Sequence, residues 1–187
     1  MESQAPFIEV LKEDGVDYDF YYYISDAYDA EGNEVTGWAD GNGDLAEDQL
    51  ALGTAFWFKA VGGAASLTMP GQVSKRTTVT KSLNANKFAL IGNPFPMSLD
   101  LTKVTGTFPA GVYDTMESKA PFIEVLKEDG IDYDFYYWIS DAYDADGNEA
   151  TGWADGNGDL VYDPVAGVSQ GFWIRLRETA GDITFAF

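Results

Sequence analysis

The chain has 187 residues, a formal charge of −20, 12 Phe, 11 Tyr and 5 Trp, and neither Cys nor His. The charge argues against binding of nucleic acid or anionic lipid, and the missing Cys and His exclude disulfides, thiol nucleophiles, Cys/His zinc sites and imidazole-dependent catalysis. We therefore predict that the protein is not an enzyme. No apolar run approaches the length of a bilayer span, so we expect no membrane insertion.

Residues 1–73 predict a meander of short antiparallel strands. The stretch FIEVL at 7–11 is an apolar strand, and the glycine-containing KEDG at 12–15 is a hairpin turn. Residues 17–25 alternate in character, so Tyr21 and Tyr23 are expected on the same face. Further strands are predicted at 35–40, 54–60 and 65–69, separated by turns rich in Asp, Asn and Gly.

Residues 74–115 differ from their surroundings in charge. They carry a net charge of +3, whereas residues 1–73 carry −12 and residues 116–187 carry −11. Opposite charge should draw this basic stretch onto the acidic modules, over about 8 Å at physiological salt. Strands are predicted within it at 77–83 and 87–92, before NPFP at 93–96 breaks the pattern. The remaining predicted strands are 122–126, 132–140, 149–155, 171–177 and 182–187.

Residues 116–160 repeat residues 1–45 at a constant offset. The two stretches differ only at Gln4/Lys119, Val16/Ile131, Tyr23/Trp138, Glu31/Asp146 and Val35/Ala150. A repeat this close is strong evidence for two copies of one structural unit. We predict an all-β fold of two tandem duplicated antiparallel β-sandwich-like modules. The predicted organisation is a first module at 1–73, a basic connector with one strand at 74–87, and a second module at 88–187.

Four motifs in residues 88–187 occur in an order that resembles β-rich repeat modules of bacterial secreted and cell-surface proteins. They are FALIGNPFP, IEVLKEDG, a WADGNGD loop and a final GFW strand. The resemblance implies exported surface or structural material, and therefore an extracellular or cell-surface location. It implies no activity and supplies no catalytic residues.

Compared with that order, the first copy begins about a quarter of the way into a module and has no counterpart of residues 88–115. Met1 matches Met116 inside the repeat, so we expect Met1 to be an interior residue exposed by processing or by a break in the chain. The alternative is a gene that starts there. The N-terminus lacks the regions of a signal peptide, so any export signal is expected to have been removed.

On this reading the first module lacks a leading strand and the second lacks a trailing one. Such a sheet exposes unpaired backbone groups and an apolar groove. We predict a structural subunit of an extracellular filament or surface assembly that polymerises head to tail with copies of itself by β-strand complementation. The predicted joining residues are Ala5, Phe7, Ile8, Val10 and Leu11 near the start and Ile183, Phe185 and Phe187 at the end.

Two interpretations of the acidic DGNGD loops remain open. Oxygen-bearing side chains at alternate positions are typical of the first half of a calcium loop. The pattern is incomplete, because Leu stands where Gly is needed and Ala stands where the last Glu is needed. The alternative is that Asp, Asn and Gly form ordinary turns. The candidate calcium ligands are Asp40, Asn42 and Asp44 in the first copy and Asp155, Asn157 and Asp159 in the second.

Two other functions compete with the structural role. Exposed aromatic rings on a β-sandwich can stack on sugars, which predicts a carbohydrate-binding or adhesive module as the alternative. Catalysis would have to use carboxylates alone, as glycosidases do, and nothing in the sequence singles out a pair. The candidate stacking residues are Tyr21, Tyr23 and Trp38 and their counterparts Tyr136, Trp138 and Trp153.

Overall fold

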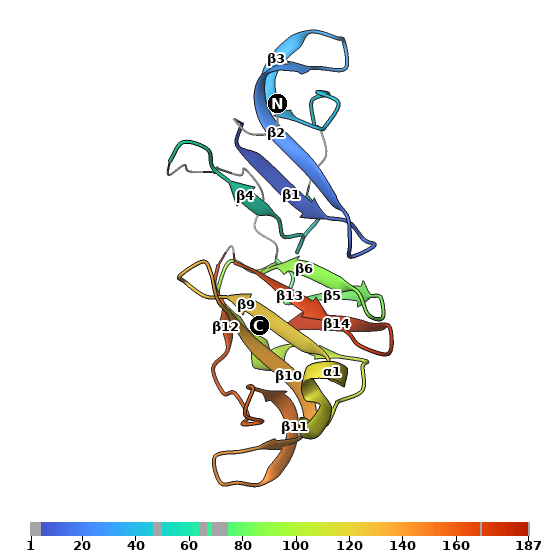
Figure 1. Cartoon of the computed structure of the whole chain (residues 1–187), viewed down its shortest axis with the longest axis vertical. Helices are drawn as coiled ribbons and strands as arrows, with labels where there is room; N and C mark the ends of the chain where they lie inside the picture. Colours follow the sequence, from blue (N-terminus) through green and yellow to red (C-terminus); the bar gives the residue numbers. More distant parts are fainter. Residues whose placement is uncertain (1–4, 47–49, 64–66, 69–74, 169, 187) are drawn as a thin grey trace.

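The computed structural model describes residues 5–46, 50–63, 67–68, 75–168 and 170–186. It is an all-β protein whose two halves lie at opposite ends of its long axis (Figure 1). Among these residues no helix has the length and apolar character needed to cross a membrane.

The first half is a four-stranded antiparallel sheet, which we call the first sheet. Its strand order is β3-β2-β1-β4, so β1 and β2 are central and β3 and β4 are the edges. The bounds of the strands are β1 (Phe7–Leu11), β2 (Tyr18–Tyr28), β3 (Glu34–Ala39) and β4 (Trp57–Lys59).

The hairpin turns of the first sheet are formed by short acidic side chains. Asp14 accepts hydrogen bonds from the backbone N–H groups of Val16 and Asp17, at 2.8 and 2.9 Å, in the turn between β1 and β2. Asp29 accepts from the backbone N–H of Asn33 at 2.8 Å in the next turn. Because Asp side chains cap turns in this way, the KEDG and DAEGNE sequences reverse the chain where they do.

The second half contains a five-stranded antiparallel sheet, the second sheet, with strand order β11-β10-β9-β13-β6. Its β9, β10 and β11 repeat β1, β2 and β3, and β13 takes the place of β4. The additional edge strand is β6. The bounds are β6 (Phe88–Gly92), β9 (Phe122–Leu126), β10 (Tyr133–Tyr143), β11 (Glu149–Ala154) and β13 (Gly171–Arg175).

Strand pairing has the same register in both sheets. Phe7 lies opposite Tyr22, as Phe122 lies opposite Tyr137, and the bulge after Ile24 in β2 recurs after Ile139 in β10. Near-identical sequence has therefore produced the same backbone arrangement twice.

A second layer covers one face of the second sheet. It contains a three-stranded sheet of order β5-β14-β8, which we call the covering sheet, and a small pair, β7 with β12. Their bounds are β5 (Thr78–Leu83), β7 (Leu99–Asp100), β8 (Thr105–Gly106), β12 (Val165–Ala166) and β14 (Gly181–Ala186). A 3-10 turn at Leu101–Lys103, a second at Tyr113–Thr115 and helix α1 (Met116–Lys119) complete this half.

The main core lies between the second sheet and its covering layer. Ile123 and Ile174 contribute from the sheet, and Leu99, Ile183 and Phe185 contribute from the layer; all five side chains are fully buried. A smaller cluster under α1 includes Met116, the counterpart of Met1. The second half is thus a two-layer sandwich, which confirms the predicted all-β, sandwich-like architecture.

The predicted strands agree with the observed ones at most positions. The strand expected in the connector forms as β5 and pairs with β14 in the covering sheet, so it is a structural part of the second half. Most of the strand expected at 65–69 lies outside the described residues. The sequence analysis also did not anticipate α1 or the two 3-10 turns.

Candidate functional site

One face of the first sheet carries a group of apolar side chains that no described strand covers. Strand pairing puts Ile8 opposite both Tyr21 and Phe58, and Tyr23 opposite Trp38, so all of these point to the same side. We call this surface the open face; it comprises Ile8, Val10, Tyr21, Tyr23, Trp38 and Phe58.

The corresponding face of the second sheet is the one that the covering layer buries. Ile123, the counterpart of Ile8, is 0% exposed, and Ile174, the counterpart of Phe58, is also 0% exposed. In the first sheet Ile8 and Phe58 are only half-buried, and Tyr23 is 47% exposed. The two sheets therefore share a face by sequence and differ in whether it is covered.

The aromatic pair in each sheet shows the difference most clearly. The rings of Trp138 and Trp153 lie 5.3 Å apart, and Phe108 from the covering layer packs 6.2 Å from the first and 6.3 Å from the second. The buried indole N–H of Trp153 donates to the carbonyl oxygen of Val104 at 3.0 Å. The covering layer thus satisfies both the apolar surface and the polar atom of Trp153.

Trp38 occupies the position of Trp153 in the first sheet and has a different environment. Its ring lies 5.4 Å from that of Tyr23 and 6.4 Å from that of Phe58. Its indole N–H donates no hydrogen bond to any described residue, and the ring is half-buried. The open face therefore holds a hydrogen-bond donor whose counterpart in the second sheet is paired.

The edges of the first sheet also differ from those of the second. β13 pairs with β9 on one side and β6 on the other, whereas β4 pairs only with β1 among the described residues. Just before β4, Thr54 forms an isolated bridge with Ile91 of β6. The outer edge of β4 itself is thus a position for strand addition.

The predicted joining segments occupy interior positions. β1, which holds Phe7, Ile8, Val10 and Leu11, is paired with β2 and β4, and β14 is paired with β5 and β8. Ala5 immediately precedes β1, and Ile183 and Phe185 are fully buried in the core of the second half. Each strand is paired on both sides over part of its length, Phe7–Glu9 in β1 and Ile183–Thr184 in β14. Joining through those parts would require a strand to leave its own sheet. Phe187 lies outside the described residues.

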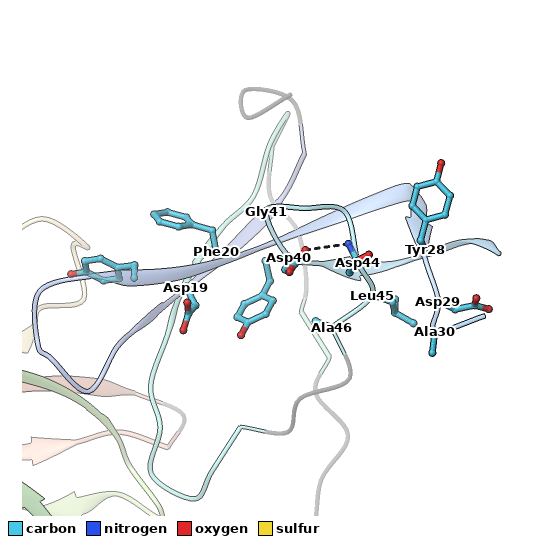
Figure 2. Close-up of a pocket in the computed structure, with 12 residues that line it drawn as sticks. Asp19, Phe20, Tyr28, Asp29, Ala30, Asp40, Gly41, Asp44, Leu45 and Ala46 are labelled. Carbon is cyan, nitrogen blue, oxygen red and sulfur yellow. Dashed lines mark hydrogen bonds between the residues drawn. The ribbon is translucent and has the colours of Figure 1, made fainter. Parts of the chain in front are cut away.

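Beside the open face lies a hollow of about 840 Å³ that is lined by Tyr21, Tyr28 and several acidic side chains. Figure 2 shows its acidic members: Asp19 on β2, Asp29 beyond the end of that strand, and Asp40 and Asp44 on the loop after β3. In the second half, the ring of Tyr113 lies against Gly158 in the corresponding loop.

The acidic loops are held together by hydrogen bonds of their own. Asp40 accepts from the backbone N–H groups of Asn42 and Asp44 at 2.8 and 3.1 Å, and from the Asn42 side-chain amide at 3.2 Å. These bonds, led by that from the Asn42 backbone, hold the pKa of Asp40 below its ordinary value. Asp155, Asn157 and Asp159 make the same three bonds.

This geometry accounts for the repeated DGNGD sequence as turn-forming chemistry. Within the described residues no group of three or more acidic side chains converges as a metal site would require. Calcium binding at Asp40 and Asp155 stays a prediction, which melting curves recorded with calcium and with chelator would test.

The candidate sugar-stacking residues are divided between the two halves. Trp153 is 2% exposed and Trp138 is packed against Phe108, which leaves no ring face for a sugar at Trp153. The prediction for Trp153 is therefore wrong, because the covering layer buries this ring. Nothing in the sequence indicated that the layer lies over it. Tyr23 and Trp38 remain on the open face.

The outer face of the second sheet carries a separate charged group. Glu124 is half-buried there, and burial raises its pKa, an effect that nearby Arg177 and Arg175 oppose. Arg175 lies over the ring of Phe88 at 4.9 Å, and Arg177 lies over the ring of Phe122 at 4.6 Å. These stacked cations cover aromatic rings and stabilise the sheet surface.

Sequence reasoning missed Val104 and Phe108, which cover the tryptophan pair of the second sheet and have no described counterpart over the first sheet. Their role depends on packing across the sandwich, and only the apolar character of Phe108 within TGTFPAG hints at it. No family model matches the chain, and comparisons with curated proteins and with solved structures return no match.

Proposed function

We propose that the protein is a structural subunit of an extracellular filament or surface assembly. Neighbouring subunits of the same repeat type join each other head to tail by β-strand complementation. The observation that carries the proposal is the open face. Among the residues that the structure describes, the same sheet occurs twice and its covering layer occurs once.

Physical chemistry supports this proposal. The open face consists of six aromatic and β-branched side chains, of which Tyr23 is exposed and the other five are half-buried. Apolar surface of this kind is costly to leave in water, and such patches commonly mark association sites. The edge of β4 that no described strand pairs with adds backbone donors and acceptors that a neighbouring strand can satisfy. The open face and that edge belong to one sheet, so a single neighbour can cover both.

Self-association of the purified full chain tests the proposal. We expect light scattering and sedimentation to show growth in mass with concentration, and negative-stain microscopy to show linear particles. Tyr23→Glu should reduce association, because it places a charge on the open face. Phe20→Glu is the matched control, since Phe20 is similarly exposed on the opposite face of β2. A chain that stays monomeric at high concentration would refute the proposed self-assembly.

Carbohydrate binding is the second candidate, and the hollow beside the open face favours it. Aromatic rings next to carboxylates, which accept hydrogen bonds from hydroxyl groups, are the chemistry of sugar sites. A glycan array followed by titration tests it with Tyr28→Ala and the counterpart Tyr143→Ala. Binding that is lost in the first variant and kept in the second supports a sugar site in the hollow. An array without any hits argues against it.

A further inference from the structure

The second half of the chain shows what kind of polypeptide fits the open face. The layer over the second sheet is built largely from residues 75–115, which we call the covering segment. This segment supplies the edge strand β6, the covering strands β5 and β8, and the buried side chains of Val104 and Phe108. The central strand of the covering sheet, β14, comes from a later part of the chain and pairs with both β5 and β8.

The fit is specific because the two sheets present nearly the same surface. Of the positions on the open face within residues 1–45, only Tyr23 differs from its counterpart, and that counterpart is Trp138, another large aromatic residue. Strand registers are identical. A segment that covers the second sheet therefore meets the same backbone spacing and similar side chains on the first.

Two polar features of the open face match the covering segment. The indole N–H of Trp38 is unpaired among the described residues, and the covering segment presents the Val104 carbonyl to the equivalent atom of Trp153. The outer edge of β4 lacks a partner in the same part of the chain, and the covering segment presents β6 to the equivalent edge of β13.

Charge favours the covering segment as the occupant over the first sheet of another copy of the chain. Residues 74–115 carry a net charge of +3, whereas residues 1–73 carry −12. Two first sheets stacked face to face would repel each other, and a basic segment would be attracted. The chain's own covering segment is already engaged in its second half, and a second copy could donate its segment only by exposing its own second sheet.

We propose that the open face binds, in trans, a basic polypeptide segment of the covering-segment type that is free in its own molecule. A phenylalanine equivalent to Phe108 packs against Tyr23 and Trp38, and a main-chain carbonyl equivalent to that of Val104 accepts the indole N–H of Trp38. A strand equivalent to β6 pairs with β4. This inference rests on the strand-complementation part of the proposed function. It differs from the self-assembly part in the donor, which is a free segment and not a second copy of the folded chain.

A synthetic peptide of residues 75–115, titrated into the full chain by calorimetry, tests the inference. The matched peptide carries Phe108→Ala. We expect saturable binding with one peptide per chain, weakened roughly tenfold or more by Phe108→Ala, as for a central aromatic anchor. Binding should also weaken with added salt, because opposite charges attract.

Variants of the protein locate the bound peptide. Trp38→Phe should weaken binding about tenfold, since it removes one hydrogen bond and part of the ring surface. Trp57→Phe is the control, because Trp57 lies on the opposite face of the same sheet, as its pairing with Glu9 shows. The five indole N–H resonances in a proton–nitrogen NMR spectrum give a second readout, in which the Trp38 signal should move most.

Three results would overturn the inference. One is the absence of binding by the wild-type peptide. Another is binding that moves the Trp153 signal and is insensitive to Trp38→Phe, because the peptide would then have replaced the chain's own segment. The third is a Trp38 signal that shifts as the protein concentration rises and that added peptide does not change. That result would show that a second copy of the chain occupies the open face.

The outcomes separate this inference from the proposed self-assembly. A chain that stays monomeric but binds the peptide at Trp38 refutes assembly from copies and supports the inference. A chain that forms linear particles but does not bind the peptide supports assembly from copies and refutes the inference.

Discussion

Replacing the same isoleucine in each half measures directly what the covering layer contributes. Ile8 and Ile123 have the same sequence neighbours, and each lies opposite a tyrosine on one side, Tyr21 or Tyr136. On the other side Ile8 lies opposite Phe58 and Ile123 opposite Ile174. Ile123 is 0% exposed, whereas Ile8 is half-buried. Ile123→Ala leaves a cavity between two packed layers and should cost about 3 kcal/mol of unfolding free energy. Ile8→Ala removes a side chain that already contacts water, so we expect about 1 kcal/mol.

Urea denaturation followed by far-UV circular dichroism and tryptophan fluorescence is the assay. The halves are separate sheets, so each substitution should shift the transition of its own half. A difference of about 2 kcal/mol corresponds to roughly 1 M urea between the two midpoint shifts. Val16→Ala is the control, since Val16 is 62% exposed and its replacement should change stability by less than about 0.5 kcal/mol. Equal costs for Ile8→Ala and Ile123→Ala would show that the first sheet is covered in solution.

Three further substitutions have defined outcomes. Gly158→Ala should lower the melting temperature more than Gly43→Ala. Both glycines have positive φ, but an added Cβ at Gly158 would lie 2.6 Å from the Tyr113 ring, whereas an added Cβ at Gly43 would have no described atom within 4 Å. Phe108→Ala should cost the second half about 3–5 kcal/mol, with no change in the transition of the first, by chemical denaturation. Asp144→Ala should lower the melting temperature at pH 7. Because backbone hydrogen bonding from Asn148 lowers the pKa of Asp144, that stabilisation is present at neutral pH and is lost as pH falls through the lowered pKa. The gap between wild type and Asp144→Ala should therefore close in acid once the Asp144 carboxyl is protonated; a gap that persists there would contradict the role given to the carboxylate.

Local sequence predicted the strands and turns well because these features depend on neighbouring residues. The alternation through Tyr21 and Tyr23 identified one face of β2, and the Asp-rich turns reversed the chain where expected. The pairing of β5 with β14 could not be predicted in the same way. These strands are separated by about 100 residues, and their pairing is set by which apolar faces remain to be buried once the second sheet has formed.

The candidate site shows the same limit. A strand at 7–11 places Ile8 and Val10 on one face. The identical sequence around Ile123 and Val125 gave no sign that one face is covered and the other open. That difference comes from Val104 and Phe108, whose contacts span the sandwich. The segments expected to join subunits, around Val10 and Ile183, belong to strands that are paired with neighbours on both sides.

The order of these elements along the chain has a consequence for biogenesis. A ribosome releases the first sheet, then the covering segment, and only afterwards the strands of the second sheet. The nascent covering segment therefore meets a ready-made acceptor, nearly identical to its final one, before the final one exists. β14, the last described strand, pairs with both β5 and β8, so the covering layer can close over the second sheet only once that strand has been synthesised.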